Sequence, residues 1–217
     1  MGGQFITFEG LDGSGKSTHL RWAGEWLRER GLSAHVTKEP GGTPLGDAIR
    51  GVFLDPQWGK VDGRVEALMV FASRRQHLVE LIEPALAAGE HVLCDRFTDS
   101  SIAYQGSGRG LPAGWVESLD QLVTDARRPD LTLLFDLPAE MAHGRGQSVK
   151  RRERGDADRI DVETLDFYQT VRDRYLALAR HEPERVRVID SSGPKEETWR
   201  QVVAVLEERF ETVEASA

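Results

Sequence analysis

Short apolar runs recur along the chain, separated by longer stretches of helical periodicity. The runs are Phe5–Phe8, Ala34–Thr37, His91–Cys94, Leu131–Phe135 and Val186–Ile189. Runs this short suit buried strands better than helices. Because strands that alternate with helices form parallel sheets, we predict an α/β fold with a five-stranded parallel sheet covered by helices on both faces.

The stretches between the runs repeat apolar residues at helical spacing. The predicted helices are one starting near Lys16, then Leu45–Leu54, Val65–Leu86, Gly114–Thr124, Thr164–Ala179 and Thr198–Phe210. We expect a break near Pro84, because proline lacks the N–H that an interior helical turn needs. No repeat or long linker divides the chain, so residues 1–217 are expected to form a single domain.

Right-handed crossovers would place the carboxyl ends of all the strands at one edge of the sheet. The segments expected at this edge are Gly10–Ser17, Glu39–Thr43, Asp95–Arg96 and the loops after Asp136 and Asp190. Ligands of open α/β sheets bind at such an edge. We therefore expect the functional site to lie there.

The segment Gly10–Ser17 matches the phosphate-loop pattern G-x-x-x-x-G-K-[ST]. It follows the first apolar run and precedes an amphipathic stretch, which is the strand–loop–helix context that the pattern requires. Backbone N–H groups of such a loop surround an anion, and the helix dipole adds to the attraction. We expect the phosphates of a nucleoside triphosphate to be bound by Gly10, Gly13, Ser14, Gly15, Lys16, Ser17 and Thr18.

Composition narrows the possible partners and surroundings. The net charge of −8 argues mildly against a polynucleotide partner, which usually needs a basic face. The single cysteine, Cys94, allows no internal disulfide and is interpreted as a small buried strand residue. We expect no signal peptide, no membrane span and a cytoplasmic location.

The segment 144–160 has almost no hydrophobic residues and many arginines. A solvated excursion is the simplest interpretation of such a charge run. In a chain with a phosphate loop we favour a mobile lid, because the planar guanidinium matches phosphate oxygens and stays charged.

Further segments indicate a particular family. They are Phe8–Ser17, Lys38–Thr43, Asp95–Phe97, Ser100–Gly110 and Arg128–Thr132. In this order they closely resemble bacterial thymidylate kinases, from about residue 4 to residue 190. The resemblance implies a P-loop kinase core that transfers the γ-phosphoryl group of ATP to dTMP with Mg²⁺, and a homodimer.

The same resemblance implies roles for individual residues. Asp12 would face the deoxyribose, and Arg96 would bind the dTMP phosphate. Asp95 and Ser17 would hold Mg²⁺. Glu39 would order basic groups or metal-bound water, although a plain turn with Pro40 is the alternative. The expected dTMP-binding residues are Asp12, Glu39, Pro40, Phe71, Arg74, Arg96, Ser101, Tyr104 and Gln105.

Two neighbouring pairs in the long helix leave the assignment open. Arg74 is preferred to Arg75 as the arginine near the acceptor nucleotide. Phe71 is the expected stacking residue, although the matching family position holds Val70. In the segment Ser101–Gln105, a tyrosine packed against the 2′ carbon would leave no space for a ribose hydroxyl.

The lid resembles the family form that carries its catalytic arginine outside the phosphate loop, because positions 11–14 hold no basic residue. Arg154 is expected at the γ-phosphate, with Arg152 and Arg159 in support, so the predicted catalytic residues are Lys16, Arg96, Arg152, Arg154 and Arg159. Either Arg145 or Lys150 begins the lid.

Two alternatives to dTMP phosphorylation stay open at this point. One is another small P-loop kinase, acting on a deoxynucleoside or on deoxycytidylate. The other is a nucleotide-dependent switch or a DNA-associated ATPase, against which the acidic net charge and the missing Asn-Lys-x-Asp pattern both argue.

Overall fold

The computed structural model describes residues 2–112, 114–145, 158–160 and 163–215. Its sheet has the strand order β2-β3-β1-β4-β5, and every neighbouring pair is parallel. The strands are β1 Phe5–Gly10, β2 Ala34–Lys38, β3 His91–Asp95, β4 Leu131–Asp136 and β5 Val186–Asp190. The predicted five-stranded parallel sheet is therefore confirmed.

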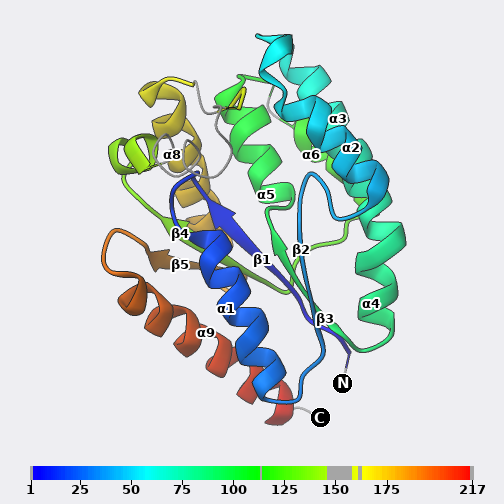
Figure 1. Cartoon of the computed structure of the whole chain (residues 1–217), viewed down its shortest axis with the longest axis vertical. Coiled ribbons are helices and arrows are strands. Elements are labelled where there is room, and N and C mark those ends of the chain that lie inside the picture. The colour runs from blue at the N-terminus through cyan, green and yellow to red at the C-terminus, as the bar shows by residue number, and fades with distance from the viewer. Residues whose placement is uncertain (1, 113, 146–157, 161–162, 216–217) are drawn as a thin grey trace.

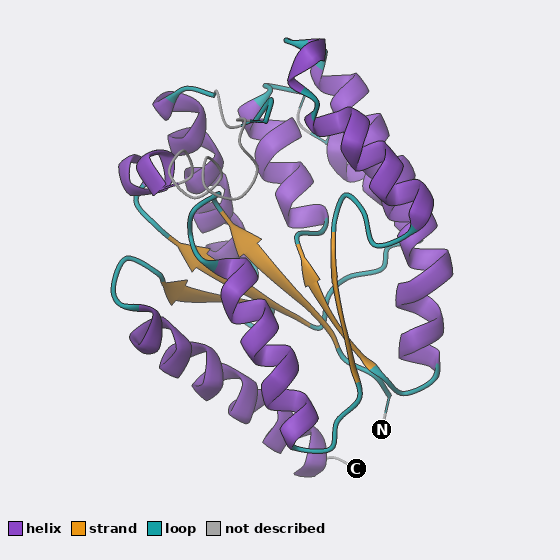
Figure 2. Ribbon diagram, viewed as in Figure 1, coloured by secondary structure: helices purple, strands orange, loops and turns teal. Residues whose placement is uncertain are grey.

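Helices cover both faces of this sheet (Figures 1 and 2). The α-helices are α1 Lys16–Glu29, α2 Pro44–Leu54, α3 Gly63–His77, α4 Glu83–Ala87, α5 Thr98–Ser101, α6 Trp115–Thr124, α8 Leu165–His181 and α9 Lys195–Ala215. A 3-10 turn η1 spans Pro56–Trp58, π-helical segments η2 and η3 span Leu78–Ile82 and Ile102–Gly108, and residues 139–145 are also helical. Apolar periodicity did not predict the helical run 98–108.

Successive side chains along the strands point to opposite faces of the sheet, which explains the two helical layers. Ile6 and Phe8 of β1 pack with Leu27 of α1 and Leu206 of α9 on one face. Leu134 of β4 packs with residues of α8 and η3 on the other face. Since successive strand residues point to opposite faces, the two apolar sets build separate cores on the two sides of the same sheet.

The long helical run from residue 63 to residue 87 differs from its prediction. The chain is not broken near Pro84; it passes through the π-helical segment η2 and continues as α4. The N–H of Glu83 donates to the carbonyl of Leu78, five residues back. Such a wider turn lets the helix accept a proline, which cannot donate to the preceding turn.

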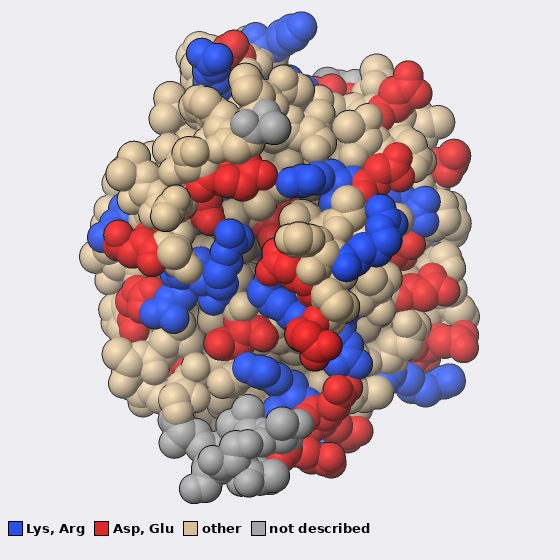
Figure 3. Space-filling view, turned by 180° about the vertical axis from the view of Figure 1, so that it is seen from behind, with Lys and Arg blue, Asp and Glu red and all other residues tan. Residues whose placement is uncertain are grey.

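The surface carries mixed charge. On the face in Figure 3, basic and acidic side chains are interleaved rather than gathered by sign. Among the residues that the structure describes, no helix combines the length and the apolar character needed to cross a membrane.

Candidate functional site

The phosphate loop connects β1 to α1 at the carboxyl edge of the sheet. A cleft at this edge is lined by Asp12, Gly13, Ser14, Gly15, Lys16, Ser17, Thr18, His19, Arg21, Lys38, Glu39, Arg50, Asp95, Arg96, Arg145, Ser191, Gly193, Pro194, Lys195 and Thr198. The loops after β1, β2, β3 and β5 thus meet in one cleft, as the parallel topology requires.

Gly10 is the member of the predicted phosphate-binding set that does not line this cleft. It is the last residue of β1, with a φ of 138°. A Cβ atom there would lie 2.5 Å from the carbonyl oxygen of Phe135 on β4. The structure therefore assigns Gly10 to the close approach of two strands rather than to phosphate contact.

Oxygen ligands suitable for a cation gather beside Lys16. The Ser17 hydroxyl donates to Asp95 Oδ2 at 2.5 Å, and Lys16 Nζ lies 3.8 Å from Oδ1 of both Asp12 and Asp95. Asp95 Oδ1 is buried and accepts no hydrogen bond from the described residues. A hydroxyl and a carboxylate with unused acceptor capacity fit Mg²⁺, which prefers oxygen ligands.

A smaller pocket, which we call the second pocket, adjoins the cleft. Its walls are Asp12, Glu39, Pro40, Arg50, Phe53, Leu54, Val70, Arg74, Arg96, Phe97, Ser100, Ser101, Tyr104, Gln105, Asp158 and Ile160. Four of these residues, Asp12, Glu39, Arg50 and Arg96, also line the phosphate-loop cleft. The two cavities therefore meet at a junction of two acids and two arginines, which we call the junction.

Arg96 is held at the junction by contacts on both of its terminal nitrogens. Nη2 donates to Asp12 Oδ1 at 3.1 Å and to the Tyr104 hydroxyl at 3.2 Å. Nη1 donates to the Ser100 hydroxyl at 3.0 Å. The backbone of Arg96 has a φ of 74°, a left-handed conformation that is rare outside glycine and that clusters at functional sites.

Glu39 and Arg74 form an ion pair that is almost completely buried. Arg74 Nε donates to Glu39 Oε2 at 2.6 Å, and both side chains are 1% exposed. Arg74 Nη2 donates to the Ser101 hydroxyl at 3.0 Å, while Nη1 is buried with no acceptor among the described residues. Glu39 thus orders a basic group beside the pocket instead of forming a plain turn with Pro40.

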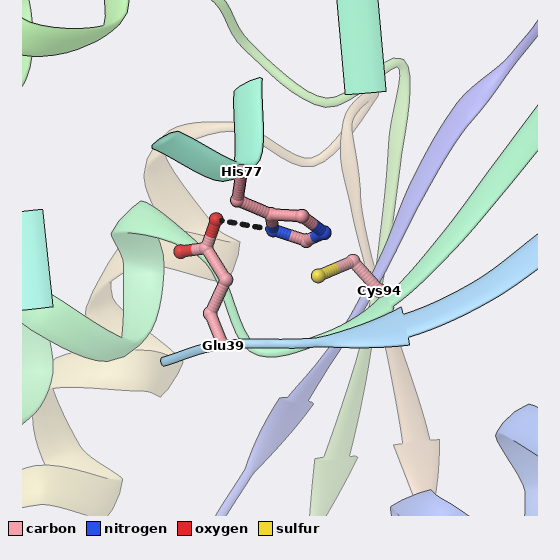
Figure 4. Close-up of side chains that lie close together, drawn as sticks. All are labelled: Glu39, His77 and Cys94. Carbon is pink, nitrogen blue, oxygen red and sulfur yellow. Dashed lines mark hydrogen bonds and ion pairs between the residues drawn. The ribbon is translucent and has the colours of Figure 1, made fainter. Parts of the chain in front are cut away.

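His77 and Cys94 lie against the other side of Glu39 (Figure 4). His77 Nδ1 contacts Glu39 Oε1 at 3.0 Å, and His77 Nε2 contacts the Thr37 hydroxyl at 2.8 Å. Burial, with the charges of Glu39 and other acids, raises the pKa of Cys94 well above its ordinary value, so the thiol stays protonated. Although the three side chains are close enough to ligate a metal, both Glu39 oxygens are already hydrogen-bonded and the thiol is neutral.

Phe71 is not where the sequence placed it. Its ring is 1% exposed and packs with Ala67, Ile102 and Val116. The Arg74 guanidinium lies over the face of this ring, with its carbon 4.4 Å from the ring centroid. Val70 lines the pocket instead, because adjacent helical residues differ by about 100° in direction. Phe97 supplies an aromatic wall that the sequence analysis missed.

Ser101 of α5 and Tyr104 and Gln105 of η3 line the wall of the second pocket. Burial raises the pKa of Tyr104, so its hydroxyl stays neutral beside Arg96 and Asp12. Gln105 Nε2 contacts Glu66 Oε2 at 3.4 Å. The predicted dTMP-binding set therefore comes together in one pocket, with the exception of Phe71.

The predicted lid is described only in part. Arg152, Arg154 and Lys150 lie outside the described residues, so their predicted roles stay predictions. Arg145 lines the phosphate-loop cleft, where it donates to the carbonyls of Ser191 and Ser192 at 3.3 and 3.2 Å.

Arg159 contradicts its predicted place at the phosphates. It is 5% exposed, its Nη1 donates to Glu66 and its Nε donates to the carbonyl of Phe53 at 3.2 Å. It lines neither the phosphate-loop cleft nor the second pocket. A buried carboxylate on α3 binds this guanidinium, and a local pattern in the lid could not indicate that partner.

Arg50 is the main residue that the sequence analysis missed. It lies on α2, and its Nη1 donates to the carbonyl of Pro40 at 3.0 Å, which places it at the junction. The available signal was a single basic residue within the otherwise apolar stretch Ala48–Leu54.

Comparison with known proteins agrees with this geometry. A family model described as thymidylate kinase matches residues 8–202. The thymidylate kinase of Chromobacterium violaceum is 47% identical over 210 residues, covering 96% of this chain and 96% of that protein. The thymidylate kinase of Paraburkholderia phytofirmans is 49% identical over 194 residues, covering 88% and 90%. The crystal structure of thymidylate kinase from Ehrlichia chaffeensis superposes with a TM-score of 0.76 at 33% identity, covering 95% of this chain and 100% of that one. The chain therefore belongs to the thymidylate kinase family of enzymes.

Proposed function

We propose that the protein transfers the γ-phosphoryl group of ATP to dTMP, giving dTDP and ADP. The observation that carries this proposal is the junction, where the phosphate-loop cleft and the second pocket share Asp12, Glu39, Arg50 and Arg96. Two nucleotides bound in the two cavities would bring their phosphates together at that point. Family membership supports the choice of ATP and dTMP.

The proposed reaction is a direct, in-line displacement. A phosphate oxygen of dTMP forms a bond to the γ-phosphorus while the bond from that phosphorus to the β–γ bridging oxygen breaks, and ADP leaves. No covalent enzyme intermediate is needed, because the attacking oxygen is already charged. The residues act by positioning and charge stabilisation, with Lys16 on the ATP phosphates and Arg96 on the acceptor phosphate.

Ser17 and Asp95 are the residues proposed to hold Mg²⁺, which would neutralise charge on the ATP phosphates when bound. Their short hydrogen bond places a hydroxyl and a carboxylate together next to Lys16. Arg152 and Arg154 are proposed to bring further positive charge from the lid, as the resemblance implies. Arg159 is not included, because it is bound to Glu66.

The lining of the second pocket supports thymine and deoxyribose as parts of the acceptor. Its polar side chains, Ser101 and Gln105, offer hydrogen bonds to a base, and Phe97 and Val70 offer apolar walls. Tyr104 is held by Arg96 and Asp12, so it cannot turn aside easily for a ribose hydroxyl. Preference for a deoxynucleotide is proposed to follow from this fixed ring.

A homodimer is proposed from an exposed apolar face on α2 and α3. A shallow groove there is lined by Ala48, Ile49, Val52, Val65, Leu68, Met69 and Ala72. Val52 and Leu68 are 50% and 52% exposed. Contiguous apolar surface of this kind marks association sites. The cytoplasmic location expected from the sequence stays a prediction.

A panel of acceptors tests the proposed function. ADP release is measured in a coupled assay with dTMP, dUMP, dCMP and thymidine, in the presence and absence of Mg²⁺. We expect turnover with dTMP to exceed that with every other acceptor and to disappear without the metal. Turnover with thymidine but not dTMP, or with dCMP above dTMP, would identify another small kinase. Acceptor-independent ATP hydrolysis stimulated by DNA would identify an ATPase.

A further inference from the structure

A buried acid, Glu9, lies directly behind the junction on β1. Its side chain is 0% exposed and does not line either cavity. Oε1 accepts from the N–H of Phe97 at 2.7 Å. Oε2 accepts from the hydroxyls of Ser100 at 2.5 Å and of Tyr175 at 2.9 Å. The roles described above for the phosphate loop and the pocket leave this carboxylate without a function.

The two hydroxyls connect Glu9 to Arg96. Arg96 Nη1 donates to Ser100 Oγ at 3.0 Å and to the Tyr175 oxygen at 3.4 Å. A guanidinium cannot accept hydrogen bonds, so both hydroxyls must accept from Arg96 and direct their hydrogens elsewhere. The two hydroxyl oxygens also lie 2.7 Å apart, so one hydroxyl can donate to the other. Glu9 Oε2 is within hydrogen-bond distance of both, and it accepts from at least one of them.

We propose that Glu9 is a positioning residue that holds the Arg96 guanidinium, through Ser100 and Tyr175, in the orientation that receives the acceptor phosphate. This inference rests on the proposed role of Arg96 at that phosphate. Glu9, Ser100 and Tyr175 together form an anchor on the Nη1 side of the guanidinium. Asp12 and Tyr104 act on the Nη2 side, where they also line the pocket.

The protonation state of Glu9 decides whether the anchor is complete. Burial, with the nearby charge of Asp99, raises the pKa of Glu9 to about 7, against the lowering effects of the Ser100 hydrogen bond and of Arg96. The other ionisable groups around it are Cys94 on β3, Tyr104 on η3 and Tyr175 on α8. The raised pKa values of these three groups keep them neutral. A neutral Glu9 donates at one of its two hydroxyl contacts, and that hydroxyl can direct its own hydrogen to the other hydroxyl. The guanidinium then loses the attraction of a buried negative charge, which is part of its support.

The test compares the wild-type enzyme with Glu9→Gln in steady-state kinetics between about pH 5.5 and about pH 8.5. Glutamine keeps the size of the side chain but presents N–H groups to the hydroxyls, as a neutral acid does. Near pH 8 we expect the KM for dTMP to rise on the order of tenfold, the value of a hydrogen bond to a charged group, while the KM for ATP stays within about twofold.

The pH dependence provides a second readout. The ratio of wild-type to Glu9→Gln kcat/KM for dTMP should rise as the pH increases through about 7, because only the wild-type acid ionises there. The second ionisation of the dTMP phosphate, near pH 6, affects both enzymes equally and cancels in this ratio. Thr7→Val is the matched control, because Thr7 lies on the same strand and its buried hydroxyl is hydrogen-bonded to Thr132 rather than to Arg96.

A ratio that does not change with pH, or an equal loss of affinity for dTMP and ATP, would overturn the proposal. If Glu9→Gln does not fold, the double variant Ser100→Ala/Tyr175→Phe cuts the same connection and must show the same selective rise in the KM for dTMP. Arg96→Met separates a failure of the proposed role of Arg96 from a failure of the role inferred for Glu9. An unchanged KM for dTMP in Arg96→Met refutes the proposed role of Arg96, whereas a raised KM there with an unaffected Glu9→Gln refutes the inference alone.

Discussion

Two consecutive arginines on α3 have opposite environments. Arg74 is buried against Glu39, Ser101 and the rings of Phe71 and Phe97. Arg75 has a 52% exposed side chain and pairs with the exposed Asp125 at 2.9 Å. A turn of about 100° per residue accounts for the difference, because it directs one side chain into the molecule and the next one out.

We predict that Arg74→Met lowers kcat/KM for dTMP on the order of a hundredfold, and that it also lowers the melting temperature, because Glu39 is left as a buried acid without its cation. In Arg75→Met, kcat/KM for dTMP should stay within about twofold of the wild-type value, since exposed ion pairs contribute little. Kinetics and thermal unfolding of both variants check this. Equal losses in the two variants would contradict the assignment of Arg74 to the pocket.

The turn between β2 and α2 shows how one element fixes another. Gly42 has a φ of 80°, and a Cβ atom there would lie 2.5 Å from His77 Nε2 and 2.6 Å from the Thr37 hydroxyl. His77 in turn contacts Glu39. The shape of this turn is therefore coupled to the buried ion pair at the junction.

We predict that Gly42→Ala and Gly51→Ala have opposite effects on stability. Gly42→Ala should cost about 1–3 kcal/mol, because the new methyl group strains the backbone and displaces His77. Gly51 lies on the exposed side of α2 with nothing within 4 Å of a Cβ position, so alanine there should add up to about 1 kcal/mol through helix propensity. Chemical denaturation of both variants measures the two free energies. Stabilisation by Gly42→Ala would show that the turn has freedom the structure does not indicate.

At the scale of the whole molecule, the strand order assembles the site. Because β3 and β4 lie on either side of β1, the phosphate loop after β1 is adjacent to Asp95 and Arg96 after β3. The helical run of α5 and η3 forms one wall of the second pocket and packs on α8. Residues from distant parts of the chain meet in the same cavity for this reason.

The proposed homodimer is tested by placing a charge on its apolar face. Leu68→Glu should convert the dimer to a monomer in sedimentation velocity, since burying an unpaired carboxylate in an interface is costly. Val188→Glu, on β5 at an exposed position outside the groove, should leave the association unchanged. A dimeric Leu68→Glu variant, or a wild-type protein that is monomeric at micromolar concentration, would refute the proposed interface.

The sequence by itself determined the features that depend on neighbouring residues. Five apolar runs predicted five strands, and the spacing of glycines before Lys16 predicted the phosphate loop, because strand alternation and anion-binding turns are set within a few residues. Half of the residues that line the second pocket were also predicted, through the resemblance of short segments to a known family.

The tertiary structure decided the features that depend on pairing between distant residues. Phe71 and Arg159 are drawn into buried contacts, Arg50 reaches the junction from a helix without a motif, and Glu9 meets Tyr175 from 166 positions away. Which face of a helix is buried, and which acid binds which arginine, follows from how the layers pack. No local pattern carries that information, because the free energy of a buried charge depends on partners brought together only by the fold.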